Sequence, residues 1–139
     1  MPRILAIDIG DRRIGLAVSD PTGMIASPAG HLLRRPGKRP PLTAILERAR
    51  ELEVTEFVVG LPLDEDGNET ARTDEARRLG RSIEQQTRLP VRLVDERFTT
   101  AAALRAVREM GGTTRGRKGD VDALAATVLL QHALALGSS

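Results

Sequence analysis

The sequence predicts an α/β domain built on a mixed five-stranded sheet with helices on both faces. Three apolar segments near the start of the chain are separated by short turns, a pattern typical of antiparallel strands. After them, helical spacing alternates with short apolar runs, which indicates parallel strands joined by right-handed crossovers. The 139 residues, 40% hydrophobic and 29% charged, suit a single globular domain over residues 1–139.

The antiparallel half is expected to contain three strands. Residues 3–9 and 14–19 are strand-like and flank a tight turn at 10–13. Residues 24–33 read as the third strand, and prolines and glycine mark a loop at 36–41. Together these segments predict an antiparallel meander.

The rest of the chain alternates between helical spacing and short apolar runs. In order, the patterns predict a helix at 42–52, a strand at 55–59, a helix at 70–88, a strand at 91–95, a helix from Thr99 or Thr100 to 110, a basic glycine-rich loop at 111–119, and a last helix at 121–136. In such sheets, functional groups gather at the carboxyl ends of the strands.

Composition excludes several kinds of site. Phe57 and Phe98 are the only aromatic residues, so modules that bind nucleic acid by stacking bases on aromatic platforms are hard to build. The chain has no cysteine, which rules out disulfides, thiolate catalysis and cysteine-bound zinc. We interpret His31 and His132 as structural. Any metal would therefore be held by oxygen ligands.

Charge and hydropathy bear on partners and location. The net charge is only +2, but segment 31–50 has Glu47 as its single acid among six bases, Arg34, Arg35, Lys38, Arg39, Arg48 and Arg50. A second basic cluster lies at 105–118. The amino-terminal apolar run at 4–9 contains Asp8 and is too short for a signal or membrane-spanning segment. We expect a cytoplasmic protein with no membrane partner.

Asp8 stands inside the first predicted strand. Side chains alternate along a strand, so Asp8 shares a face with the apolar Ile4 and Ala6. A carboxylate there costs free energy unless it is paired or bound to a cation. Asp8 is therefore a candidate for chemistry. The alternative is that it only accepts hydrogen bonds from the turn that follows.

Asp95 and Glu96 end the last predicted strand, and alternation sends them to opposite faces. Strand geometry lets only one of them share a site with Asp8, and alternation alone leaves the choice open. The alternative reading is that both acids pair with Arg97 or lie near the amino terminus of the next helix, where negative charge is favoured.

Asp120 and Asp122 lie at the predicted start of the last helix. We interpret Asp120 as its N-cap. Asp122 precedes Ala125, Ala126, Leu129 and Ala133 at helical spacing, which places it on the apolar face. A plain acid that stabilises the helix dipole is the alternative. Acids at two strand ends and one helix start can converge on one patch that suits divalent cations, and paired cations about 4 Å apart promote phosphodiester hydrolysis.

The chain also carries ordered motifs over nearly its whole length: Asp8-Ile9-Gly10 with Arg12-Arg13-Ile14-Gly15, Val18-Ser19-Asp20, Val59-Gly60-Leu61-Pro62-Leu63 with Asp66-Gly67, Asp95-Glu96-Arg97 with Thr99-Thr100, and Asp122 with Ala125-Ala126. In these motifs the sequence resembles the YqgF/RuvX family. It departs from the family pattern at Asp11, where Thr or a similar residue is expected, and at Phe98, where Leu is usual.

The resemblance implies an RNase H-like fold and a metal-dependent nuclease, a hydrolase of phosphodiester bonds that processes the 5′ end of precursor 16S rRNA. It implies Asp8, Glu96 and Asp122 as catalytic acids and ligands of Mg²⁺ or Mn²⁺, with Asp95 and Asp120 as further candidate ligands. A Holliday junction resolvase acting on branched DNA is the alternative. The partner is then structured RNA or branched DNA, and a homodimer is a further expectation.

Phosphate contacts are expected from basic residues near the acids. The candidates for nucleic-acid binding are Arg12, Arg13, Gly60, Arg97, Arg115, Arg117 and Lys118. Gly60 would allow close approach of a substrate, or would only close a loop. Residues 115–118 form a phosphate clamp, or a solvated loop. The segment 111–118 misses the phosphate-binding loop consensus, and 64–67 predicts a turn rather than a calcium loop.

Two other function classes remain at this point. Actin-like ATPases also begin with an Asp-x-Gly hairpin, but they need two such lobes to enclose a nucleotide, and 139 residues supply one. A non-catalytic nucleic-acid-binding protein is the other class. Three carboxylates oppose it, because acids in a phosphate-binding cleft repel the substrate unless metal neutralises them.

Overall fold

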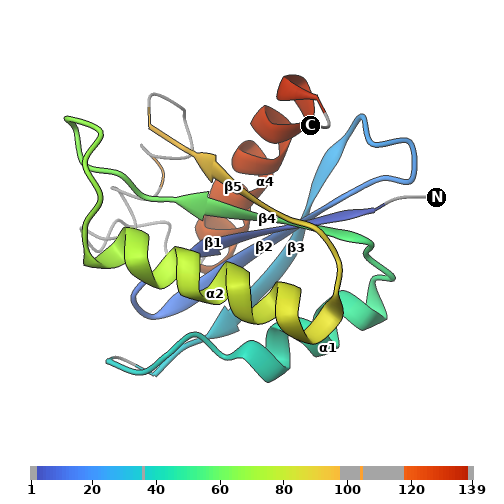
Figure 1. Cartoon of the computed structure of the whole chain (residues 1–139). Helices are drawn as coiled ribbons and strands as arrows, with labels where there is room; N and C mark the ends of the chain where they lie inside the picture. The colour runs from blue at the N-terminus through green and yellow to red at the C-terminus, as the bar shows by residue number, and fades with distance from the viewer. Residues whose placement is uncertain (1–2, 36, 98–103, 105–117, 138–139) are drawn as a thin grey trace.

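The computed structural model describes residues 3–35, 37–97, 104 and 118–137. Its elements, in chain order, are β1 (Ile4–Ile9), β2 (Arg13–Ser19), β3 (Ala26–Leu33), α1 (Leu42–Glu51), β4 (Glu56–Leu61), α2 (Ala71–Thr87), β5 (Val91–Asp95) and α4 (Lys118–Leu136) (Figure 1).

The strands form one five-stranded sheet in the order β3-β2-β1-β4-β5. β1 pairs with β2 and β2 with β3 in antiparallel fashion, whereas β4 lies parallel to both β1 and β5. The parallel pairs need helical crossovers, which the helices of the second half supply. The predicted mixed sheet, antiparallel in its first three strands and parallel after them, is confirmed.

Helices cover both faces of this sheet, as the sequence predicts. α1 and α2 lie on one side and α4 on the other (Figure 1). On the α1–α2 side, alternate strand residues such as Ile7 and Val59 build an aliphatic core around the buried Phe57. On the α4 side, the small Ala6 and Ala17 let the helix lie close, through residues such as Ala126 and Leu129.

The start of the last helix differs from the prediction. The helix begins at Lys118 rather than at residue 121, so Asp120 lies within its first turn and is not the N-cap. Apart from residue 104, the predicted helix from Thr99 or Thr100 to 110 lies outside the described residues, as do residues 111–117 of the predicted loop at 111–119.

The third strand also begins later than predicted, at Ala26 rather than residue 24. Asp20 holds the preceding residues in a turn, because its Oδ1 accepts hydrogen bonds from the backbone N–H groups of Met24 and Ile25, both at 2.9 Å. The Met24 and Ile25 side chains are exposed. Among the described residues, no helix is long and apolar enough to cross a membrane.

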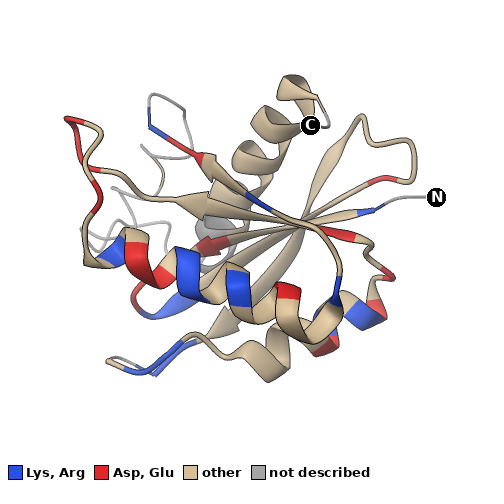
Figure 2. Cartoon of the chain, viewed as in Figure 1, with Lys and Arg blue, Asp and Glu red and all other residues tan. Residues whose placement is uncertain are grey.

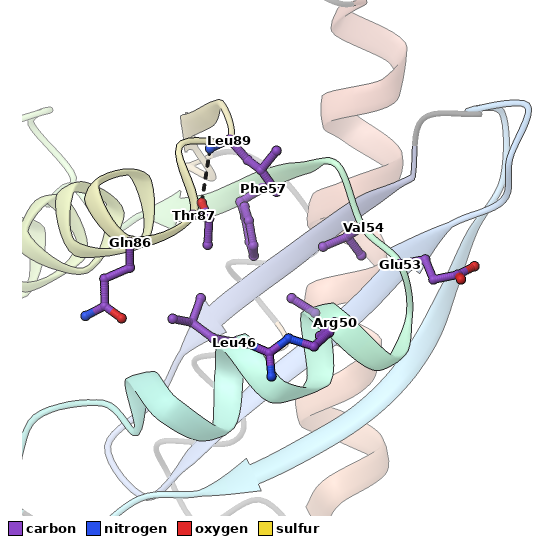
Figure 3. A pocket seen from close by; sticks show the side chains of 9 residues that line it. Leu46, Arg50, Glu53, Val54, Phe57, Gln86, Thr87 and Leu89 are labelled. Carbon is purple, nitrogen blue, oxygen red and sulfur yellow. Dashed lines mark hydrogen bonds between the residues drawn. The ribbon is translucent and has the colours of Figure 1, made fainter.

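A hollow of about 440 Å³ opens between the carboxyl ends of α1 and α2 (Figure 3). Phe57, at the start of β4, contributes to its lining together with Leu46, Val54 and Leu89. Arg50 and Glu53 supply its charged groups. The carboxyl end of β4, where the candidate site lies, is at the opposite edge of the sheet.

Candidate active site at the ends of the central strands

Asp8 lies near the carboxyl end of β1, the middle strand of the sheet. Ala6, two residues earlier, packs in the core beneath α4, so Asp8 belongs to the same face. Asp8 is only 1% exposed. Burying an ionised carboxylate costs on the order of several kcal/mol unless hydrogen-bond donors or a cation compensate for the lost hydration. The predicted placement of an acid on the apolar face is confirmed.

Two glycines flank Asp8 within the sheet. Gly15 on β2 is its direct antiparallel partner. On β4, Gly60 lies one residue beyond the parallel pair Ile7–Val59, and is itself paired with Val94 of β5. Neighbouring positions across a sheet share a face. The two positions directly beside Asp8 in the sheet therefore carry no side chain.

Glu96 shares this face, and Asp95 does not. Val94 packs in the core beneath α4, and Glu96 follows two residues later, buried to 3% exposure. Asp95 points to the opposite side, and its side chain is 39% exposed. Strand alternation left open whether Asp95 or Glu96 shares a face with Asp8. The structure shows that this residue is Glu96.

Asp122 lies near the start of α4. It lies one helical turn before Ala126, which packs against the sheet with Leu129 and Ala133. The helix thus carries position 122 on its sheet-facing stripe, whereas position 120 is not on that stripe. The side chains of both acids lie outside the described residues. Within the described part, no cluster of three metal-ligating side chains occurs.

Asp95 is engaged by Arg97. Its carboxylate accepts a hydrogen bond from the Arg97 backbone N–H at 2.9 Å. It also forms an ion pair with the Arg97 guanidinium, at 2.9 Å. Partial burial favours a raised pKa for Asp95, but these hydrogen bonds and the Arg97 charge outweigh it and lower the pKa. The same hydrogen bonding raises the pKa of Arg97.

Arg97 also packs over Gly67, a residue with φ of +84°. The positive φ favours glycine, and a Cβ on Gly67 would lie 2.7 Å from Arg97 Nη1, so any larger residue would displace the Arg97 guanidinium. Around it, Asp64 Oδ1 accepts hydrogen bonds from the N–H groups of Asp66 and Asn68 at 3.0 and 2.8 Å. The predicted turn is confirmed, and Arg97 links it to the end of β5.

The predicted phosphate-binding residues are spread along this edge. Arg12 is exposed in the turn after β1, and Arg13 begins β2 partly buried. Lys118 begins α4, but its side chain is outside the described residues, as are Arg115 and Arg117 entirely. Asp11, the departure from the family pattern, is paired with Arg72 at 3.0 Å, which offsets its charge.

Arg34 is a positioning residue that sequence reasoning missed. Its side chain is 8% exposed and forms a bidentate pair with Glu75 of α2. The guanidinium also donates to the carbonyl oxygens of Gly10 and Lys38, both at 2.9 Å. Arg34 therefore ties the turn after Asp8 to α2. The only signal in the sequence was its place in a basic segment, which does not distinguish it from its exposed neighbours.

Thr73 performs a similar role for β4. It is fully buried, and its hydroxyl donates to the Pro62 carbonyl oxygen at 2.8 Å while accepting from the Thr70 N–H at 3.0 Å. Thr70 caps α2 in return, completing a capping box. The strand end that carries Gly60 is thus fastened to the start of α2.

Two buried acids, Asp8 and Glu96, thus lie on one face of the mixed sheet, at the carboxyl ends of β1 and β5. The model of the RuvX family, described as "Holliday junction resolvase", matches residues 2–136. The chain belongs to the RuvX family. The predicted family resemblance is thereby confirmed.

Several curated relatives share the name "Putative pre-16S rRNA nuclease". The protein from Clavibacter michiganensis subsp. michiganensis is 46% identical over 130 residues, which cover 94% of this chain and 81% of the relative. The Koribacter versatilis protein is 44% identical and covers 93% and 84% of the two chains. The Maridesulfovibrio salexigens protein is 37% identical and covers 96% and 98%.

The fold is also similar to that of solved RuvC structures. The RuvC chain from T. thermophilus in complex with a Holliday junction substrate matches with a TM-score of 0.57 and 18% identity, covering 99% of this chain and 97% of that one. This likeness confirms the RNase H-like fold. Family and relatives together identify the chain as a nuclease, a hydrolase of phosphodiester bonds that acts on nucleic acid.

Proposed function

We propose that Asp8, Glu96 and Asp122 are the catalytic acids of this nuclease and that its substrate is precursor 16S rRNA, cut at the 5′ end. The observation that carries the proposal is the burial of Asp8 and Glu96 on one face of the sheet, at the carboxyl ends of β1 and β5. The start of α4 supports a third acid on that face. The relatives' names support the substrate.

The donor set fits a hard divalent cation. Carboxylate oxygens are the ligands that Mg²⁺ and Mn²⁺ prefer, and the chain has no cysteine to favour softer metals. The two neighbours of Asp8 in the sheet, Gly15 and Gly60, carry no side chain. A bound cation would supply Lewis-acid stabilisation for the charge that develops on the phosphate. Asp8, Glu96 and Asp122 would hold it. Asp95 and Asp120 are weaker candidates for metal ligands. Asp95 is paired with Arg97 on the opposite side of the sheet, and position 120 is not on the sheet-facing stripe of α4.

The remaining residues of the edge bind and orient the substrate. Arg12 and Arg13 lie in and beside the turn after Asp8, and Arg115, Arg117 and Lys118 precede Asp122 in sequence. Their charges would hold phosphates next to the acids and offset the repulsion that those acids exert. At Gly60, the missing side chain lets the backbone of the substrate approach the sheet. The observed Asp95–Arg97 pair assigns Arg97 a second task, holding the 64–68 turn.

Cleavage of a four-way DNA junction is the second candidate activity, favoured by the description of the family and by the RuvC-like fold. Symmetric cutting of a junction requires two sites, so this candidate activity requires a homodimer, since each chain offers one acidic centre. The rRNA activity places no such demand. Both candidates fit a cytoplasmic protein that binds nucleic acid.

The two substrates can be compared directly. The purified chain is incubated with precursor 16S rRNA and with a four-way DNA junction, in parallel, with Mg²⁺ or Mn²⁺ and with chelator. We expect metal-dependent cleavage of the RNA near its 5′ end and slower or no cleavage of the junction. Preferential junction cleavage by a dimer would assign the second activity. Cleavage that persists in chelator would contradict the acidic centre.

A further inference from the structure

A groove of about 650 Å³ lies outside the acidic site, between the loop before α1 and the helix α2. Arg39 lines it from the loop, and Arg78 and Arg81 line it from the helix. Two acids, Asp74 and Glu75, belong to the same lining. The groove lies on the side of the sheet that α1 and α2 cover, away from α4.

Both acids of the groove are already matched by a cation. Glu75 forms the bidentate pair with the nearly buried Arg34, and Asp74 pairs with Arg78 at 3.3 Å. In the part of the chain that the structure describes, Arg39 and Arg81 have no ion-pair partner, and both are exposed. The groove therefore presents two guanidinium groups whose charge no acid of the lining offsets.

The wall that carries Arg39 is held in place. Arg34 Nε donates to the Lys38 carbonyl oxygen at 2.9 Å while its guanidinium grips Glu75, so the loop is fastened against α2. Arg35 and Lys38 are exposed beside Arg39 and add to the positive charge of this wall. Figure 2 shows this basic loop below the blue segments of α2. The acidic centre does not use these basic residues.

The groove extends along α2 from the edge that carries the acidic site. Ala71, the first residue of α2, lines one end, close after the strand end that Thr73 fastens. Arg81 lies ten residues further on, roughly 15 Å along the helix axis at 1.5 Å per residue. The acidic site faces α4 and the groove lies on the other face of the sheet, so an arm that passes around the carboxyl ends of the strands from the site would meet Arg78 and Arg81.

The chemistry of the lining favours a base-paired arm. Guanidinium groups form paired hydrogen bonds with phosphate oxygens. No aromatic residue lines the groove, so single-stranded bases find no stacking platform. Backbone contacts without base stacking are the way proteins hold double-helical RNA.

We propose that this groove binds the phosphate backbone of a base-paired arm of the nucleic-acid substrate, at a distance from the bond that is cut. Arg39 and Arg81 supply the principal contacts. The proposal rests on the proposed function for its choice of substrate, but it concerns residues that play no part in the acidic centre.

Salt-dependent binding tests the groove without any cleavage. The variant Arg39→Gln/Arg81→Gln is compared with Arg50→Gln/Arg88→Gln, which removes two exposed arginines at the far ends of α1 and α2. The probe is an RNA hairpin with a stem of two helical turns, in buffer with chelator. Loss of two phosphate contacts should weaken binding and reduce the slope of log K against log salt by about 2, roughly 1 per contact. The control should keep the wild-type slope.

Two results would contradict the proposal that this groove binds a base-paired arm. Equal slopes for the two double variants would show that general charge, not this surface, binds the RNA. A loss that is as large for a single strand of the same length would show that the groove does not select a paired arm.

Cleavage separates this inference from the proposed function. With metal and a long-stemmed substrate, the groove variant should raise KM and leave kcat unchanged, because the reacting phosphate is untouched. Trimming the stem to half a turn should abolish the difference. A wild-type chain that cleaves nothing, yet shows the slope difference, would defeat the proposed function and leave the groove standing.

Discussion

At the residue scale, the composition of the candidate site depends on which acid at the end of β5 faces α4. Strand alternation in the sequence predicts that the side chains of Asp95 and Glu96 lie on opposite faces of the sheet. It does not predict which of these faces holds the site. The core contacts of Val94 decide it, since they fix the α4 side of the strand. Those contacts depend on how α4 docks, which a local pattern does not contain. Only the family resemblance pointed to Glu96 beforehand.

Glu96→Gln should lower kcat on the order of 10²-fold or more, a loss comparable to removing one group that stabilises transition-state charge. Asp95→Asn should cost less, because Asp95 acts through Arg97 on the 64–68 turn. Both variants are assayed at saturating metal after circular dichroism has verified their folding. A larger loss of kcat in Asp95→Asn than in Glu96→Gln would show that Asp95, not Glu96, is the catalytic acid.

At the element scale, the strands and most helices followed from periodicity, whereas the ties between them did not. The hydrogen bond from Thr73 to Pro62 joins residues that are eleven positions apart in the sequence. The hydrogen bond from Arg34 to Gly10 joins residues that are twenty-four positions apart. Such bonds come from tertiary packing, so no local signal announces them. The later start of β3 is similar, because the Asp20 side chain claims the backbone groups that would extend the strand.

Thr73→Val keeps the shape of the side chain but removes a buried hydroxyl that serves two backbone partners. The Pro62 carbonyl oxygen and the Thr70 N–H then lose their partner. We expect the free energy of unfolding to fall by about 1–3 kcal/mol in a urea titration. Thr43→Val, at an exposed position of α1, is the control and should change it by less than about 0.5 kcal/mol. An equal effect of both changes would contradict the tie.

Asp20 gives the β2–β3 turn a pH dependence. The Thr22 hydroxyl and the backbone N–H groups of Ile25 and Met24 donate to its carboxylate and lower its pKa from 3.8 to about 2. A lowered pKa in the folded state means that the turn is stabilised above pH 3.8 and loses this contribution as the pH falls towards about 2. An NMR titration of the Asp20 carboxyl carbon should give a midpoint near 2. A midpoint at 3.8 or above would show that the carboxylate does not hold the turn.

At the scale of the whole molecule, the sequence was sufficient for the mixed sheet, the two helical faces and the presence of a buried acid on β1. Each of these depends on hydrophobic periodicity, which the packed core preserves. The groove along α2 was beyond its reach, because Arg39 and Arg81 come from segments that only the fold brings together.

Binding of the intact protein to nucleic acid should depend steeply on salt. Guanidinium groups that contact phosphates displace condensed counterions, so the affinity for a structured RNA should fall by at least about 10-fold between 50 and 200 mM salt if several such contacts form. Fluorescence anisotropy in chelator measures this without cleavage. An affinity that stays constant over that range would exclude a basic binding surface.

The most direct measurement is the rate of cleavage of precursor 16S rRNA by the wild-type protein and by Asp8→Asn, side by side in Mn²⁺ and in Mg²⁺. The amide keeps the volume of the buried side chain and removes its charge, so the melting temperature should be equal or higher while the cleavage rate falls by on the order of 10²-fold or more. An Asp8→Asn variant that is folded and cleaves at the wild-type rate would contradict the assignment of the acidic centre.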